Sequence, residues 1–384
     1  MVLKSFLLLL LLMSSFHLPL STGCVPDQPD FTVTANSTAH IDYGLSYPVT
    51  YKFSIPEAAD HMTVFERKAP AESWNQLPTK TSGDFFNGID AVRFDYLNNL
   101  AYVSVGFGPT TDTIQLLFHE DGSAVDGVSF VEINEYYDDR QAACVFTADD
   151  WTDGNNNLAF KNACDACYSR QIWFSPAIIT CLEGHPLEEA TWADIQGKLD
   201  QGYVEPVSHS RTHPDVPYDN YDSEVGGSKQ DIIDNLELPA LNRKGSTEYV
   251  LAWTAPYGAS NATLRRKLGE YKYLEDTSWF VSTNYGSFPS WNATDGLYNY
   301  WNRYGMAEGK TEAEMNAQWD IDYAAGNIYH LGAHWSPAWE EGGPVYNHLD
   351  YIKGKKDVWY VGMGHLFAYH YVQERGQVTI AEEP

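Results

Sequence analysis

Two short segments of the chain combine residue types that can bind a metal ion and move protons. Asp149 and Asp150 follow directly after the apolar run Cys144-Val145-Phe146, and further along the segment Ser208–Pro214 carries His209 and His213. An apolar run that ends on two carboxylates indicates a buried strand with acids at its C-terminal end. Two imidazoles spaced by four residues can reach one ion when the segment makes a turn. With one carboxylate they form a borderline-soft site that suits zinc or another late divalent metal.

The second part of the chain, predicted to span residues 140–384, contains the strands and helices that must position these groups. Short apolar strands alternate with helical segments, which predicts an α/β fold with a parallel sheet that closes into a barrel. Thr311 with Glu314 has capping-box spacing, as do Thr191 with Asp194 and Ser228 with Asp231, and Pro344 and Gly376 mark a helix start and a helix end. The seven expected strands are Cys144–Thr147, Ile172–Ser175, Val204–Val207, Tyr249–Trp253, Trp279–Ser282, Ile328–Leu331 and Val358–Val361.

The first part of the chain, predicted to span residues 24–135, is expected to be rich in β-strands. Val49–Ile55 alternates between apolar and polar residues, and Val92–Leu97 pairs naturally with Leu100–Phe107 across an Asn98-Asn99 turn. Thr113–Phe118 is a further apolar strand. We expect a β-sandwich domain ahead of the barrel, with a binding or spacer role.

Residues 1–23 have the pattern of a secretory signal peptide. Lys4 precedes the apolar run Phe6–Met13, which is well short of the roughly 20 residues needed to cross a bilayer, and small residues follow at Ser21–Gly23. We therefore expect a secreted protein without a transmembrane segment. The alternative is a lipid anchor at Cys24, because Ser21–Cys24 is similar to a lipobox. With 52 acidic against 24 basic residues the formal net charge is −28, which argues against nucleic acid as a partner.

The remaining cysteines and the glycosylation motifs carry weaker signals. Cys144, Cys164, Cys167 and Cys181 are too few for a disulfide scaffold, although one or two bridges could form in an oxidising compartment. Cys164 and Cys167 have zinc-knuckle spacing, but no second pair accompanies them, which favours a structural role. Acceptor motifs for N-glycosylation, relevant in a eukaryotic host, begin at Asn36, Asn261 and Asn292.

The order of motifs resembles that of the polysaccharide deacetylases, the fourth family of carbohydrate esterases. Their Thr-Phe-Asp-Asp motif is similar to Thr147–Asp150 with alanine in second place, and their His-Ser/Thr-x-x-His motif is similar to His209–His213. Arg-x-Pro-Tyr is matched in part by Thr254–Tyr257, and Leu-x-His by Ile328–His330. Asp276 and Trp279 are candidates for the Asp and Trp of a further motif. The resemblance covers roughly Cys144 to Arg375.

This resemblance implies a distorted (β/α)7 barrel and a function for each matched residue. Asp150, His209 and His213 would hold a divalent metal, zinc by preference. Asp149 would be the general base and His330 the general acid, while the backbone N–H of Tyr257 would complete the oxyanion site. The implied activity is metal-dependent removal of acetyl groups from a polysaccharide. An N-acetylglucosamine polymer such as chitin or peptidoglycan is the favoured substrate, with an O-acetylated glycan as the alternative.

Two features of the sequence leave alternatives open. Thr254 stands where the family has the arginine that orients the base, and Arg211 could reach the site from another direction. His334 lies four residues after His330 and could be the acid instead. The missing arginine favours, as a second hypothesis, a non-catalytic carbohydrate-binding protein. A third hypothesis, a non-haem iron oxygenase, also uses two histidines and a carboxylate, but the alternation of strands and helices argues against it.

Overall fold

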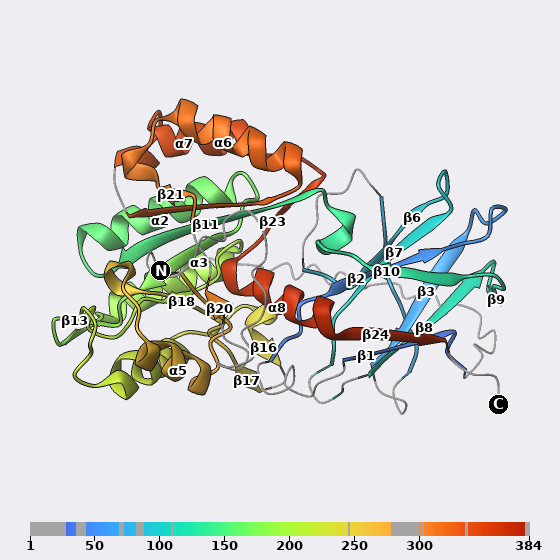
Figure 1. The fold of residues 1–384 in the computed structure, drawn as a ribbon, viewed down its shortest axis with the longest axis horizontal. Helices are drawn as coiled ribbons and strands as arrows, with labels where there is room; N and C mark the ends of the chain where they lie inside the picture. The colour runs from blue at the N-terminus through green and yellow to red at the C-terminus, as the bar shows by residue number, and fades with distance from the viewer. Residues whose placement is uncertain are drawn as a thin grey trace, which may run out of the picture.

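The computed structural model describes most of the chain from residue 28 to residue 380, in two units that lie side by side (Figure 1). The predicted signal peptide, Cys24 and the first and last glycosylation motifs lie outside the described residues. Among the described residues, we find no helix that is both long and apolar enough to cross a membrane. The described ranges are 28–35, 44–68, 73–81, 88–108, 111, 113–244, 246–277, 299–300 (backbone only), 303–334 and 337–380.

The N-terminal unit consists of two mainly antiparallel sheets. In the strand order of each sheet, the first contains β24 (Gly376–Ile380), β1 (Phe31–Ala35), β8 (Thr113–Glu120), β3 (Met62–Arg67) and β4 (Asn75–Gln76), with β9 (Ser123–Ala124) paired to β8. The second contains β10 (Ser129–Ile133), β2 (Val49–Ser54), β7 (Leu100–Val105), β6 (Ala91–Asp95) and β5 (Thr79–Lys80). Alternate residues of β3 are buried, as expected for a strand with one face on a core. Phe31 of one sheet meets Phe53 of the other, with ring centroids 4.8 Å apart.

The second unit is built on one parallel sheet. Its order is β20 (Asn299–Tyr300), β19 (Glu275–Thr277), β18 (Ala252–Thr254), β15 (Val207–Ser208), β12 (Phe174–Ile178), β11 (Ala142–Trp151), β22 (Ile328–His334) and β21 (Gly305–Met306). A ninth strand, β23 (Val358–Tyr360), pairs with the first residues of β11. The ten-residue β11 is buried along almost its whole length, because it lies in the middle of this sheet.

Helices follow most of these strands. They are α2 (Asn155–Tyr168), α3 (Glu189–Gln201), α4 (Ser228–Asn235), α5 (Ala262–Glu270), α6 (Glu312–Ala325), α7 (Pro344–Ile352) and α8 (Met363–Arg375). Small hairpins are formed by β13 (Cys181–Leu182) with β14 (His185–Pro186) and by β16 (Arg243–Lys244) with β17 (Thr247–Glu248). The result is a parallel α/β half-barrel preceded by antiparallel sheets, which confirms the predicted fold class.

The two units share a hydrophobic core. One cluster of buried residues includes Val49 and Phe53 of the sandwich together with Val145 and Phe367 of the barrel. α8 lies between the units and runs directly into β24, which pairs with β1 (Figure 1). The last strand of the chain therefore belongs to the N-terminal unit, although the predicted boundaries assigned all of 140–384 to the barrel. One buried cluster therefore spans both units.

The predicted fifth strand, Trp279–Ser282, falls outside the described residues. Among the described residues, β18 pairs with β19, whose sequence Glu275-Asp276-Thr277 is polar yet buried. A strand made of buried polar residues carries no apolar run for sequence analysis to detect. Cys144, Cys164, Cys167 and Cys181 are buried free thiols.

Candidate metal centre and catalytic site

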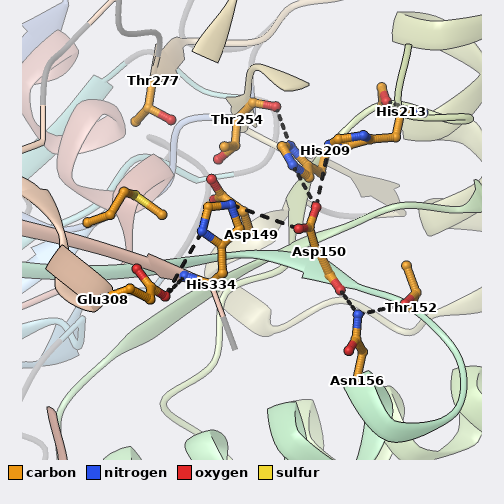
Figure 2. A network of polar contacts seen from close by, with 12 residues as sticks. Asp149, Asp150, Thr152, Asn156, His209, His213, Thr254, Thr277, Glu308 and His334 are labelled. Carbon is orange, nitrogen blue, oxygen red and sulfur yellow. Dashed lines mark hydrogen bonds and ion pairs between the residues drawn. The ribbon is translucent and has the colours of Figure 1, made fainter. Parts of the chain in front are cut away.

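Asp149 and Asp150 lie at the C-terminal end of β11, where the strand contains a bulge. The register between β11 and β12 shifts between Ala148 and Trp151, and Asp150 has a positive φ of 79°. Such a bulge re-aims neighbouring side chains and is common beside functional sites. Asp150 points toward His209 and His213, as Figure 2 shows. The adjacent carboxylates can therefore serve different purposes.

The two histidines follow β15 directly and meet Asp150 through their Nε2 atoms. His209 donates from Nδ1 to the carbonyl oxygen of Thr254 at 2.7 Å, which orients its ring and leaves Nε2 facing Asp150. Nε2 of His209 lies 3.3 Å from Oδ1 of Asp150, and Nε2 of His213 lies 3.4 Å from the same oxygen. The potential ligand atoms of all three residues lie within 4.8 Å of one another.

These three residues fit a divalent metal. Two ligand atoms about 2.1 Å from one ion at a tetrahedral angle lie about 3.4 Å apart, close to both distances from Asp150. Apart from the two imidazole nitrogens, the buried Oδ1 of Asp150 has no hydrogen-bond partner. Unpaired buried oxygens are costly, so this atom is suited to a cation. The donor set of two imidazoles and one carboxylate suits zinc and its neighbours.

Local electrostatics affect the charge of each of these groups. Burial, assisted by the neighbouring His209, lowers the pKa of His213 to about 4, so its imidazole is neutral at physiological pH. Burial alone would lower the pKa of His209, but its hydrogen bond to Asp150 and the nearby carboxylates outweigh burial and raise it. Burial would raise the pKa of Asp150, and the hydrogen bond from His209 with the surrounding imidazole charges lowers it instead. Asp150 is therefore ionised and ready to bind a cation.

Asp149 is paired with Arg303, a residue that sequence analysis missed. Nη1 and Nη2 of Arg303 each donate to one carboxylate oxygen of Asp149 at 2.8 Å, and both side chains are buried. Nη2 also donates to the hydroxyls of Thr254 at 3.3 Å and Thr277 at 2.9 Å. The guanidinium thus lies against Thr254, which stands where the resembled motif has an arginine. The only sequence signal was that a buried carboxylate needs a cation, and that signal does not single out Arg303.

Arg211, the alternative partner considered for the base, contacts other residues. Its Nε donates to Asp231 at 3.0 Å, and its Nη1 donates to Ser223 at 3.4 Å. With Thr180 and Trp192 it lines a pocket of about 510 Å³ between α3 and α4. Arg303, rather than Arg211, therefore holds Asp149.

His330 and His334 occupy different environments on β22. His330 is fully buried, its Nε2 lies 3.2 Å from the Thr147 hydroxyl, and burial lowers its pKa well below the usual value. His334 is paired in register with Asp149 at the end of the sheet, and its side chain is half exposed. Nε2 of His334 lies 3.9 Å from Oδ2 of Asp150, and Nδ1 lies 4.0 Å from Glu308. Figure 2 shows His334 between Asp150 and Glu308. This geometry favours His334 over His330 as a proton donor to a bound substrate.

Tyr257 lies at the rim of the site. Its side chain is 63% exposed, and its ring centroid lies 4.7 Å from that of His213. The residue has a φ of 55°, which turns the backbone sharply just after β18. Of the further motif, Asp276 is buried on β19 and Trp279 lies outside the described residues.

The chain is thus an α/β half-barrel protein with a candidate divalent-metal site beside a buried carboxylate–arginine pair. No protein-family model matches the sequence, and the curated proteins also give no match. Solved structures with similar folds include polysaccharide deacetylases.

Three of these solved structures, two deacetylases and one pseudoenzyme, are compared with this chain below. The chitin deacetylase of Colletotrichum lindemuthianum is 12% identical over 60% of this chain and 88% of its own, with a TM-score of 0.40. A peptidoglycan deacetylase of Bacillus subtilis is 13% identical over 62% of this chain and 95% of its own, with a TM-score of 0.37. A pseudoenzyme of carbohydrate esterase family 4 from Bacillus anthracis is 11% identical over 62% of this chain and 69% of its own, with a TM-score of 0.39.

Proposed function

We propose that the protein is a metal-dependent hydrolase that removes acetyl groups from a polysaccharide. The observation that carries this proposal is the placement of Asp149, held by Arg303, next to the Asp150–His209–His213 cluster. A divalent metal, zinc by preference, would polarise the acyl carbonyl and lower the pKa of water from ~15.7 toward ~7. Every other part of the chemistry falls to side chains and backbone groups of the chain.

The residues around the cluster can divide the proton transfers between them. Asp149 is adjacent in sequence to a metal ligand and is fixed in orientation by two hydrogen bonds from Arg303, as a general base requires. We assign the acid to His334, because its imidazole is half exposed and faces Asp150. Glu308 accepts a hydrogen bond from the backbone N–H of His334 and also lies near its ring, so it can orient the imidazole. The backbone N–H of Tyr257 would stabilise the oxyanion.

The substrate class comes from the resemblance of the motifs. An N-acetylglucosamine polymer such as chitin or peptidoglycan is the favoured substrate, and an O-acetylated glycan is the alternative. The exposed ring of Tyr257 at the rim offers an apolar face of the kind on which sugars stack. Secretion, inferred from the pattern of residues 1–23, would bring the protein to such a substrate.

Pairing of Asp149 with Arg303 weakens the case for the non-catalytic alternative. That alternative arose because Thr254 stands in place of the family arginine. The same carboxylate nonetheless receives a bidentate guanidinium from a different element. Asp149 is therefore oriented as the proposed general base would need to be, which supports the hydrolase over a purely carbohydrate-binding protein.

The test is acetate release from N-acetylated and O-acetylated oligosaccharides. Protein stripped with a chelator should release no acetate, and addition of one equivalent of zinc should restore release. Binding of these oligosaccharides without acetate release, with zinc bound at one equivalent, would instead establish the carbohydrate-binding alternative.

A further inference from the structure

The carboxylate of Glu224 lies against the loop that joins the two histidine ligands. Glu224 belongs to a π-helical segment, Asp222–Gly227, that leads into α4, and it is 7% exposed. Single π-helical turns are rare and recur at functional sites. Oε2 of Glu224 accepts hydrogen bonds from the backbone N–H groups of Arg211 at 3.0 Å and Thr212 at 2.8 Å. Oε1 accepts a third from the hydroxyl of Thr212 at 2.8 Å.

The loop held in this way has an unfavourable backbone. Ser210 and His213 both adopt positive φ, 67° and 58° respectively, although neither is glycine. A residue other than glycine in this conformation is strained and persists only when its surroundings hold it. The hydroxyl of Ser210 accepts a hydrogen bond from the N–H of His213 at 2.9 Å. Arg211 and Thr212 lie between Ser210 and His213, and both accept support from Glu224 through the hydrogen bonds that they donate to it. These hydrogen bonds therefore offset the strain of the whole turn.

The two histidines depend on this turn to different degrees. His209 is fixed independently of it, because its backbone N–H donates to Ile178 at 2.9 Å and its ring donates to Thr254. The ring of His213 packs between the rings of His209 and Tyr257, with centroids 4.8 and 4.7 Å away. Among the described residues, the polar contact of that ring is with Asp150. The position of the His213 ring therefore depends on the backbone of this turn as well as on these contacts.

We propose that Glu224 is a positioning residue that sets metal affinity through His213. It touches no ligand atom and no reacting group. It fixes the backbone of Arg211 and Thr212 so that Nε2 of His213 stays at ligand distance from the point shared with Asp150 and His209. This inference rests on the metal site of the proposed function, since it concerns how tightly that site binds its ion.

The experiment measures zinc affinity of the metal-free protein by competition with a chromogenic chelator. Glu224→Gln keeps the size of the side chain but replaces an acceptor oxygen with a donor amide. Thr212→Val removes only the hydrogen bond from the Thr212 hydroxyl to Glu224, and it replaces Glu224→Gln as the test variant if that protein folds poorly. Removal of a residue that orients a ligand typically weakens metal binding by ~10- to 100-fold, and we expect that range for Glu224→Gln with a smaller loss for Thr212→Val.

Asp222→Asn provides the matched control, because Asp222 lies in the same π-helical turn but contacts Lys267 and Tyr271 on the outside. Its zinc affinity should stay within about twofold of the native value. At saturating zinc, kcat of Glu224→Gln should return to near the native value with KM unchanged. A merely structural defect would instead lower the melting temperature of the metal-free protein, and saturating zinc would not restore kcat.

Native zinc affinity in both Glu224→Gln and Thr212→Val would overturn the inference while leaving the proposed function intact. A Glu224→Gln protein that binds zinc fully but stays inactive would also overturn it, since Glu224 would then act on the chemistry rather than on the ligand. Absence of zinc binding by the native protein would overturn both this inference and the proposed function.

Discussion

The metal-binding part and the proton-transfer part of the candidate site are built in different ways. Asp150, His209 and His213 come from the ends of two strands of the same sheet, and the two histidines share one five-residue turn. Their nitrogen and oxygen atoms must converge on one point, so the local backbone has to be specific. Residue types and spacing along the chain therefore carry most of the information about this part.

The proton-transfer part is assembled from groups that are distant in sequence. Asp149 on β11 is completed by Arg303, and His334 at the end of β22 is completed by Glu308. A buried carboxylate needs a cation close by, but any element that reaches it can supply one. Different strands or loops can therefore supply such a group without a change in the chemistry. The contrast predicts that the two parts can be disabled separately.

The largest effects should come from one substitution in each part. His209→Ala removes a ligand and should abolish zinc binding and acetate release together. Asp149→Asn should keep zinc, because all three ligands remain, while turnover falls by ~10² or more. Zinc content and deacetylation rate measured on both proteins separate these outcomes. Loss of zinc from Asp149→Asn would make Asp149 a ligand and remove the distinction between the two parts.

The next largest effect distinguishes the two histidines of β22. His334→Gln should lower turnover by ~10² or more at saturating zinc, since a general acid typically contributes that much. His330→Gln disturbs a buried imidazole next to Thr147, so it should lower the free energy of unfolding by about 1–3 kcal/mol with little change in turnover per folded molecule. Urea denaturation and steady-state rates on both variants provide the comparison. The reverse pattern would restore His330 as the acid.

Arg303→Met tests whether Arg303 orients Asp149, as the arginine of the resembled motif is expected to orient the base. Leaving the buried Asp149 carboxylate unpaired should destabilise the protein by about 3–5 kcal/mol and reduce turnover without loss of zinc. The double variant Arg303→Met/Thr254→Arg returns a guanidinium to the position of the family motif. Because the hydroxyl of Thr254 lies 3.3 Å from Nη2 of Arg303, we expect partial recovery of both stability and turnover. A double variant no better than Arg303→Met would show that the position of the arginine cannot be exchanged.

A buried carboxylate away from the site should affect stability alone. Glu205 is fully buried and accepts the backbone N–H of Gly364 at 2.9 Å, and burial raises its pKa to about 8. Between about pH 4.5 and pH 8 the folded state then holds a proton that the unfolded state has released, so stability falls as pH rises, by at most about 1.4 kcal/mol per pH unit. Glu205→Gln should flatten this part of the curve. An unchanged slope in chemical denaturation across these pH values would rule out this contribution.

The fold and the metal-binding part could largely be predicted from the sequence. Apolar runs mark β11, β12 and β22, since a strand buried on both faces needs them. The helix start at Pro344 follows from local backbone chemistry. The capping box of Thr311 with Glu314 is present for the same reason. The helix end at Gly376 is also where the sequence predicts it, although Gly376 has an extended backbone with φ of −66° and begins β24 instead of forming a left-handed cap.

The remaining features depend on contacts that spacing does not encode. Ser228 with Asp231 has capping-box spacing, yet Asp231 accepts hydrogen bonds from Thr180 and Arg211 instead. β19 escaped detection because its residues are polar and buried. Arg303 and Glu308 lie in a segment without a recognisable motif, and only the folded sheet brings them to Asp149 and His334.

Anomalous diffraction from a crystal grown with zinc tests the account most directly. It should show one ion about 2.0–2.2 Å from Oδ1 of Asp150 and from Nε2 of both His209 and His213. Asp149 should lie outside the coordination sphere with its carboxylate still paired to Arg303. An ion coordinated by Asp149, or no ion at these three residues, would contradict the division of the site into metal-binding and proton-transfer parts.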